Sequence, residues 1–106
     1  MDEIVFTNRP KYGYYPIELL RTKRKRTTIR SEPLNLGVYR VSNTDLVVEI
    51  ERVKEINPYT DLTDEIALDD IGTDSKEILV AVLKSFRRGH RLPSKMYLHG
   101  LLVGIA

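Results

Sequence analysis

The stretch RTKRKRTTIR, residues 21–30, combines a run of positive charge with a short β-strand pattern. It holds six Lys or Arg and no acid, and its second half contains the β-branched residues that strands favour. Successive side chains of a strand point to opposite faces. Ile29 is therefore expected to face the core, while Thr28 and Arg30 share the other face. The sequence predicts a strand over about residues 26–31 with one polar, positively charged face.

Hydrophobic periodicity and turn residues divide the rest of the chain into short elements. Strands are expected at 3–7, 38–41, 46–53 and 96–105. Helices are expected at 17–22, between an N-cap at Thr63 and a stop at Gly72, and from Asp74 or Ser75 to about Arg88 with Gly89 as the C-cap. The order β-α-β-β-β-α-α-β in 106 residues predicts a single α+β domain, residues 1–106. Its small mixed sheet is expected to curl, with helices on one side.

The composition argues against several kinds of site. Without Cys, the chain has no disulfide, no thiolate nucleophile and no Cys-based zinc site. Its two histidines, His90 and His99, are nine residues apart, a spacing that matches no standard metal motif. No metal and no cofactor are therefore expected. His99 lies in an apolar strand and is interpreted as a hydrogen-bonded core residue, and His90 as an exposed loop residue.

The chain is expected to be soluble and cytoplasmic, without a membrane partner. No apolar run approaches the roughly 20 residues that span a bilayer. Its acidic start, Met1-Asp2-Glu3, lacks the features of a signal peptide. The absence of Gln and Trp, together with 30% charged residues, is typical of proteins from thermophiles.

Charge is unevenly distributed, although the formal net charge is only +2. A second basic stretch, residues 84–95, holds five Lys or Arg, whereas residues 61–77 hold seven acids and one Lys. Arg87 and Arg88 fall in the expected last helical turn, where cations interact favourably with the helix dipole. Arg91 lies beyond that turn and is freer to contact phosphate. Two basic stretches on one face would form an electrostatic footprint for RNA.

At its basic strand the chain resembles the ASCH domain family. The family pattern is a helix, a G-R-K-T-x-T-x-R-like stretch, a loop to a Gly, a barrel strand, and a segment of the form L-T-x-E-x-A-x-x-D/E-G. The matching segments follow in the same order: the helix at 16–22, the basic strand at 23–30, Gly37, and LTDEIALDDIG at 62–72. Departures occur at Lys23 and Arg26, which stand where the pattern has Gly and Thr.

The resemblance implies an α+β fold, a small PUA-like mixed β-barrel with two to three helices packed on it and a cleft beside the basic strand. Some family members look like RNA-binding modules. The smallest bacterial members are amidohydrolases that remove the acyl group from acetylated cytidine, using a Lys, a Thr and a Glu. By motif position, Lys25 matches the Lys, Thr28 matches the Thr, and Asp70, one methylene shorter, matches the Glu.

The leading interpretation is an RNA- or nucleotide-binding module that uses the basic cleft. Guanidinium and ammonium groups bind phosphate, hydroxyls contact base edges, and an aromatic ring can stack on an unpaired base. The residues expected to make these contacts are Arg24, Lys25, Arg26, Thr28, Arg30, Tyr15, Arg88 and Arg91.

Three other interpretations stay open. In a small amidohydrolase acting on an acylated pyrimidine nucleoside, Lys25 would take the hydroxyl proton of Thr28, which attacks the amide carbonyl. Asp70 would then deliver a proton to the leaving amine. In a protein-interaction domain, the basic strand would dock an acidic partner. In a purely structural interpretation, Thr27 and Thr28 favour the strand, and the basic residues solvate its end.

Overall fold

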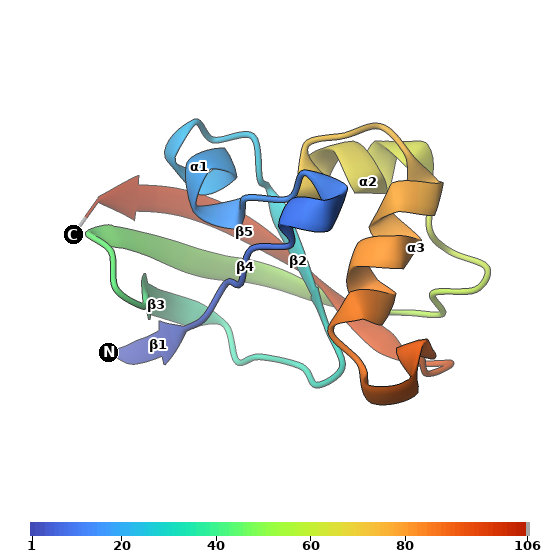
Figure 1. The fold of residues 1–106 in the computed structure, drawn as a ribbon. Coiled ribbons are helices and arrows are strands. Elements are labelled where there is room, and N and C mark those ends of the chain that lie inside the picture. Colours follow the sequence, from blue (N-terminus) through green and yellow to red (C-terminus); the bar gives the residue numbers. More distant parts are fainter. Residues whose placement is uncertain (106) are drawn as a thin grey trace.

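The structure, a computed structural model, describes residues 1–105; Ala106, the last residue of the expected domain, lies outside the described part. Its five strands form one curled sheet, a half-barrel (Figure 1). The first two strands of the sheet order pair in parallel and all other neighbours are antiparallel, so the sheet is mixed as expected. The order across the sheet is β1 (Asp2–Ile4), β3 (Gly37–Val41), β4 (Leu46–Ile56), β5 (Met96–Ile105) and β2 (Thr27–Arg30).

Strand β4 is longer than the sequence pattern predicted. A bulge interrupts the alternation of buried and exposed residues from which its end was predicted. Leu46, Val48 and Ile50 are buried as alternating residues of one face. The register with β5 then shifts between Ile50 and Arg52, and Arg52 is exposed rather than continuing the buried face. Pairing continues to Ile56, three residues beyond the predicted end. Bulges increase local twist and bend the strand, which fits the curl of the sheet.

The three helices are α1 (Pro16–Arg21), α2 (Asp64–Ile71) and α3 (Lys76–Ser85), and single 3₁₀ turns lie at Pro10–Tyr12 and Arg88–His90. The side chains of Thr63 and Ser75 cap α2 and α3 by accepting hydrogen bonds from Ile66 N and Ile78 N. Such caps satisfy backbone donors that the first helical turn leaves free.

Two further sequence predictions about helix and strand ends are wrong. Helix α3 ends at Ser85 rather than near Arg88. The backbone N–H of Phe86 closes the last turn by donating to the carbonyls of Leu83 and Lys84, and the backbone is then extended at Arg87. Gly89 therefore does not cap α3 and lies in the following 3₁₀ turn. At the N-terminus, residues 5–7 leave the expected strand, since β1 pairs with β3 only from Asp2 to Ile4.

The core has two parts. One lies inside the curl of the sheet and includes Leu20 of α1 with residues of β1, β3, β4 and β5. The other joins α2 and α3 to the sheet through Ile29 of β2, Ile56 of β4 and Met96 of β5. Figure 1 shows α2 and α3 next to each other, and α2 packs against β2, the edge strand of the sheet. Strand β2 is therefore anchored to the second core part through Ile29.

Candidate functional site beside strand β2

The turn between α1 and β2 directs the Lys25 side chain into the protein. The backbone amides of Arg24 and Lys25 both bond to the carbonyl of Leu19, and Lys23 adopts a positive φ of 59°. Lys25 is only 1% exposed. Its Nζ donates to the backbone carbonyl of Asp70 at 2.8 Å and lies 3.4 Å from Asp70 Oδ1. A residue from the centre of the basic run is therefore a buried ion-pair partner.

Asp70 is held from both sides in the last turn of α2. Its second carboxylate oxygen, Oδ2, accepts a hydrogen bond from the Thr27 hydroxyl at 3.0 Å. The residue is 4% exposed. Burying one charge without its partner would be strongly unfavourable, whereas the two opposite charges together are tolerated when their hydrogen bonds are satisfied. Lys25, Asp70 and Thr27 therefore form one buried polar unit.

Two aromatic rings lie against this unit. The Lys25 ammonium is 5.3 Å from the ring centroid of Tyr14 and 5.5 Å from that of Phe6, within cation–π range. Burial raises the pKa of the Tyr14 hydroxyl above its ordinary value, and the nearby Lys25 charge opposes the shift. Tyr14 therefore contributes a neutral hydroxyl to the site at neutral pH.

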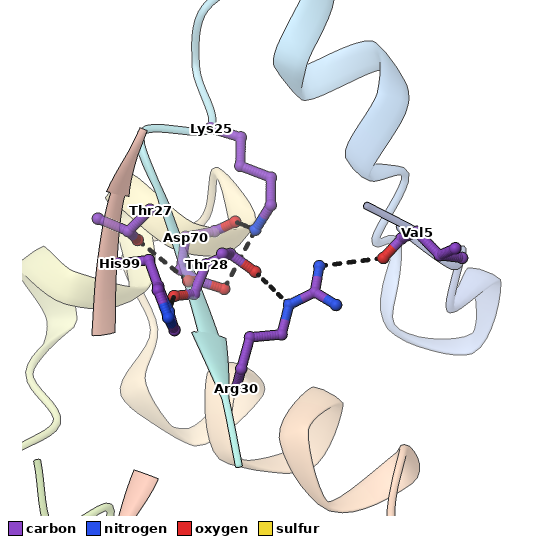
Figure 2. A network of polar contacts seen from close by, with 7 residues as sticks. All are labelled: Val5, Lys25, Thr27, Thr28, Arg30, Asp70 and His99. Atoms are coloured by element: carbon purple, nitrogen blue, oxygen red, sulfur yellow. Dashed lines mark hydrogen bonds and ion pairs between the residues drawn. The ribbon is translucent and has the colours of Figure 1, made fainter. Parts of the chain in front are cut away.

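Thr28 and Arg30 share one side of β2, as the alternation of a strand requires. Arg30 Nε donates to the Thr28 hydroxyl oxygen at 3.2 Å, and Arg30 Nη2 donates to the backbone carbonyl of Val5 at 3.0 Å (Figure 2). The guanidinium carbon also lies 5.0 Å from the centroid of the Phe6 ring. Burial lowers the pKa of Arg30 from its ordinary value, but it remains charged at any physiological pH.

His99 is fully buried on β5 and supports β2 from the adjacent strand. The backbone N–H of Leu34 donates to its Nε2 at 2.9 Å, and its Nδ1 lies 3.1 Å from the carbonyl oxygen of Thr28. Since Nε2 accepts, Nδ1 carries the proton and donates to Thr28, so the imidazole is neutral. Burial also lowers its pKa. As the sequence indicated, His99 is a hydrogen-bonded core residue.

A cavity of about 340 Å³ opens beside these residues. This volume falls in the range of about 300–1,000 Å³ that is usual for small-molecule sites. Its lining comes from the segment after β1, from Tyr14, from β2, from α2, from α3 and the residues just after it, and from Met96 of β5. The side chains that matter most for its chemistry are Phe6, Tyr14, Thr28, Arg30, Asp70 and Arg87.

The structure brings together only part of the predicted set of site residues. Thr28, Arg30 and Asp70 line the cavity, and Lys25, which is not a lining residue, contacts Asp70. Tyr15 and Arg24 instead line a second, more open hollow of about 430 Å³, where Arg24 Nη2 donates to the carbonyl of Gly72. The remaining three, Arg26, Arg88 and Arg91, are exposed and line neither hollow.

Other lining residues were not singled out by the sequence. Tyr14, rather than its neighbour Tyr15, contacts the buried polar unit, because Tyr15 is 41% exposed and Tyr14 only 6%. Arg87 has a sufficient explanation as a helix-end cation, and Phe6 belongs to an expected strand. Only the pairing of distant segments reveals their position at the cavity.

Comparison with protein-family models, with curated proteins and with solved structures gave no match to this chain. Within residues 1–105, no group of three or more His, Asp or Glu side chains is arranged to hold a metal ion. None of the helices in that described range has the length and apolar character needed to cross a bilayer.

Proposed function

We propose that this chain is an ASCH-family domain with a PUA-like fold, and that it binds a nucleoside or nucleotide in the cavity beside β2. The observation that carries the proposal is the combination, in one cavity, of aromatic rings, a strand hydroxyl, a carboxylate and guanidinium groups. Aromatic faces suit a base, and the polar groups suit its edge and its sugar or phosphate. The mixed half-barrel and the order of its elements support the fold assignment.

The proposal favours a compact ligand over a long RNA. Several cations of the basic stretch are engaged by groups of the protein itself: Arg21 pairs with Asp45 at 3.0 Å on the surface, Arg24 donates to a backbone carbonyl, and Lys25 pairs with Asp70 in the interior. Cations committed in this way contribute less to a broad phosphate-binding footprint. The arrangement therefore fits recognition of a single nucleotide, either free or at the end of an RNA, better than binding along the backbone of a long RNA.

Calorimetric titration with cytidine 5′-monophosphate and with single-stranded RNA of two to six nucleotides tests this proposal. We expect the mononucleotide to supply most of the binding free energy, with little gain from added length. The logarithm of the binding constant should fall with log salt by about 0.7 for each phosphate contacted. Affinity that rises steadily with length, together with a slope equivalent to several phosphates, would instead indicate an extended RNA interface.

A second candidate function, deacylation of an acylated pyrimidine nucleoside, is favoured by two observations: Lys25 pairs with Asp70, and Asp70 and Thr28 line the same cavity. One proton moving from the Lys25 ammonium to the Asp70 carboxylate across this 3.4 Å contact would create an amine base and a carboxylic acid together. The amine would take the Thr28 proton as the Thr28 oxygen forms an ester with the acyl carbon. The carboxylic acid would protonate the departing amine, and water would then hydrolyse the ester.

Release of cytidine and acetate from acetylated cytidine, followed by chromatography, tests the second candidate. If it is correct, Thr28→Val should reduce turnover by on the order of 10³-fold or more, whereas Thr28→Ser should retain part of it. The exposed Thr60 provides a matched control, and Thr60→Val should leave the rate unchanged. Equal rates for the wild type and Thr28→Val would exclude Thr28 as the nucleophile.

A further inference from the structure

The cavity beside β2 carries positive charge that the protein does not neutralise. Lys25 and Asp70 cancel each other, and Asp70 is the single acid among the cavity-lining residues of the described part. Arg30 and Arg87 also line the cavity. No carboxylate within residues 1–105 forms an ion pair with either guanidinium. Two positive charges therefore face the same space without a counter-ion.

Arg30 also has free hydrogen-bond donors that can be reached from solvent. A guanidinium offers five N–H donors, and Arg30 uses Nε for Thr28 and one Nη2 hydrogen for Val5. Its Nη1 has no partner among residues 1–105. No fully buried side-chain nitrogen or oxygen in that range lacks a partner, so Nη1 must be accessible. Since Arg30 lines the cavity, its free donors are available to a ligand there.

The guanidinium of Arg30 is fixed in place before any ligand binds. The Phe6 ring, the Val5 carbonyl and the Thr28 hydroxyl contact it on different atoms. Its partial burial makes the charge poorly solvated, a condition that an anionic ligand would relieve. Arg87 has one such contact, because its Nε donates to the carbonyl of Arg91 at 2.9 Å. Little side-chain entropy is lost when groups held like this bind an anion.

We propose that Arg30 and Arg87 form an anion subsite of this cavity, and that the ligand is a nucleotide whose phosphate monoester they bind. The inference rests on the proposed function and adds to it the charge class of the ligand. A phosphate monoester carries about −1.5 to −2 charges at pH 7, which matches the two unpaired guanidinium groups. The planar fork of Arg30 suits two phosphate oxygens, a geometry that Lys cannot reproduce.

Calorimetry with three probes tests the subsite: cytidine 5′-monophosphate, cytidine and inorganic phosphate. The wild type should bind the monophosphate at least about tenfold more tightly than cytidine, since charge-assisted hydrogen bonds contribute this much or more. Arg30→Lys and Arg87→Gln should each weaken monophosphate binding by about 10- to 100-fold and change cytidine binding little. Arg87→Gln keeps the test informative if the Arg30 variant folds poorly.

Arg88 provides the matched control, since it is adjacent in sequence, carries the same charge, is exposed and does not line the cavity. Arg88→Gln should bind all three probes like the wild type. Equal affinity of the wild type for cytidine and its monophosphate would overturn the anion subsite and leave the proposed function standing. Binding of inorganic phosphate alone, lost in Arg87→Gln, would support the subsite but contradict a nucleotide ligand. No binding of any probe would overturn both.

Discussion

Lys25 and Asp70 meet inside the protein, with the Lys25 Nζ 2.8 Å from the Asp70 carbonyl oxygen and 3.4 Å from its carboxylate. This contact ties the turn before β2 to the last turn of α2. One of the central cations of the basic stretch is therefore used to position α2. Asp70, the only cavity-lining acid of the described residues, also accepts a hydrogen bond from Thr27, and Thr28 lines the same cavity.

Removing Lys25 should destabilise the protein strongly. Lys25→Met leaves the Asp70 carboxylate buried without its counter-ion, an effect of about 3–5 kcal/mol on the free energy of unfolding. Asp70→Asn should have a similar effect, because it leaves the ammonium unpaired. Urea denaturation followed by circular dichroism measures both.

The double variant Lys25→Met/Asp70→Asn is the control for that experiment. It removes both charges, so its loss of stability should be clearly smaller than the sum of the two single losses. Additive effects, or single losses below about 1 kcal/mol, would contradict a buried ion pair at this position.

Thr27 should stabilise the protein through Asp70 rather than through strand formation alone. Thr27→Val keeps a β-branched side chain but removes the donor to Asp70 Oδ2, which should lower the free energy of unfolding by about 1–3 kcal/mol. Thr22→Val is a suitable comparison, since the Thr22 side chain is exposed and bonds only to helix carbonyls. Surface changes of that kind usually alter stability by less than about 0.5 kcal/mol. Similar losses in the two variants would argue against a specific role for Thr27.

His99 should make stability depend on pH below neutrality. Its pKa in the folded protein lies below the ordinary value of 6.5, mainly because of burial, so the unfolded chain binds the proton more readily. The contribution of neutral His99 is therefore fully present above about pH 6.5 and is lost as pH falls through the lower folded-state pKa. Protonation of Nε2 would also remove the acceptor for the Leu34 N–H.

Urea unfolding at pH 7.5, 6.5 and 5.5 measures this dependence. His99→Gln should flatten the decline in stability between these pH values, because Gln does not titrate. His90→Gln should keep the wild-type decline, since His90 is exposed in a 3₁₀ turn. If both variants keep the decline, other groups are responsible for it.

Gly72 should tolerate Ala much less well than Gly13. Both have a positive φ, 72° and 66°, which costs a non-Gly residue roughly 1–2 kcal/mol. A Cβ at Gly72 would also lie 2.7 Å from the buried Leu19 side chain, whereas a Cβ at Gly13 would meet nothing within 4 Å. Overpacking of this kind adds about 1–3 kcal/mol. Thermal unfolding of the two Ala variants measures the difference, and equal midpoints would show that Leu19 adapts without loss.

Periodic and capped segments were predictable from the sequence. The α+β class, the order of elements and the cap at Thr63 depend on local patterns, and the structure confirms them. For α3 the sequence allowed Asp74 or Ser75 as the cap, and the structure has Ser75. Element ends were less predictable. The end of α3 depends on a tight turn at Phe86, and the length of β4 depends on a bulge whose pairing partner lies on β5.

The candidate site was predictable only where a motif named its residues. The position of Asp70 next to Lys25 depends on α2 meeting the turn before β2, which are 45 residues apart in sequence. The roles of Tyr14 and Arg87 have no local signal, since a buried Tyr and a helix-end Arg are both common for structural reasons. Charge density alone overestimated how many cations of the basic stretch are free to bind a ligand, because it does not show which of them are already paired within the protein.

The most direct test of the central claim is a backbone-amide chemical-shift titration with cytidine 5′-monophosphate. Binding in the cavity predicts saturable shifts at Phe6, Thr28, Arg30, Asp70 and Arg87, with no comparable shifts at Arg24, Arg88 or Arg91. Shifts confined to those exposed arginines, with Thr28 and Arg30 unmoved, would contradict a nucleotide site beside β2.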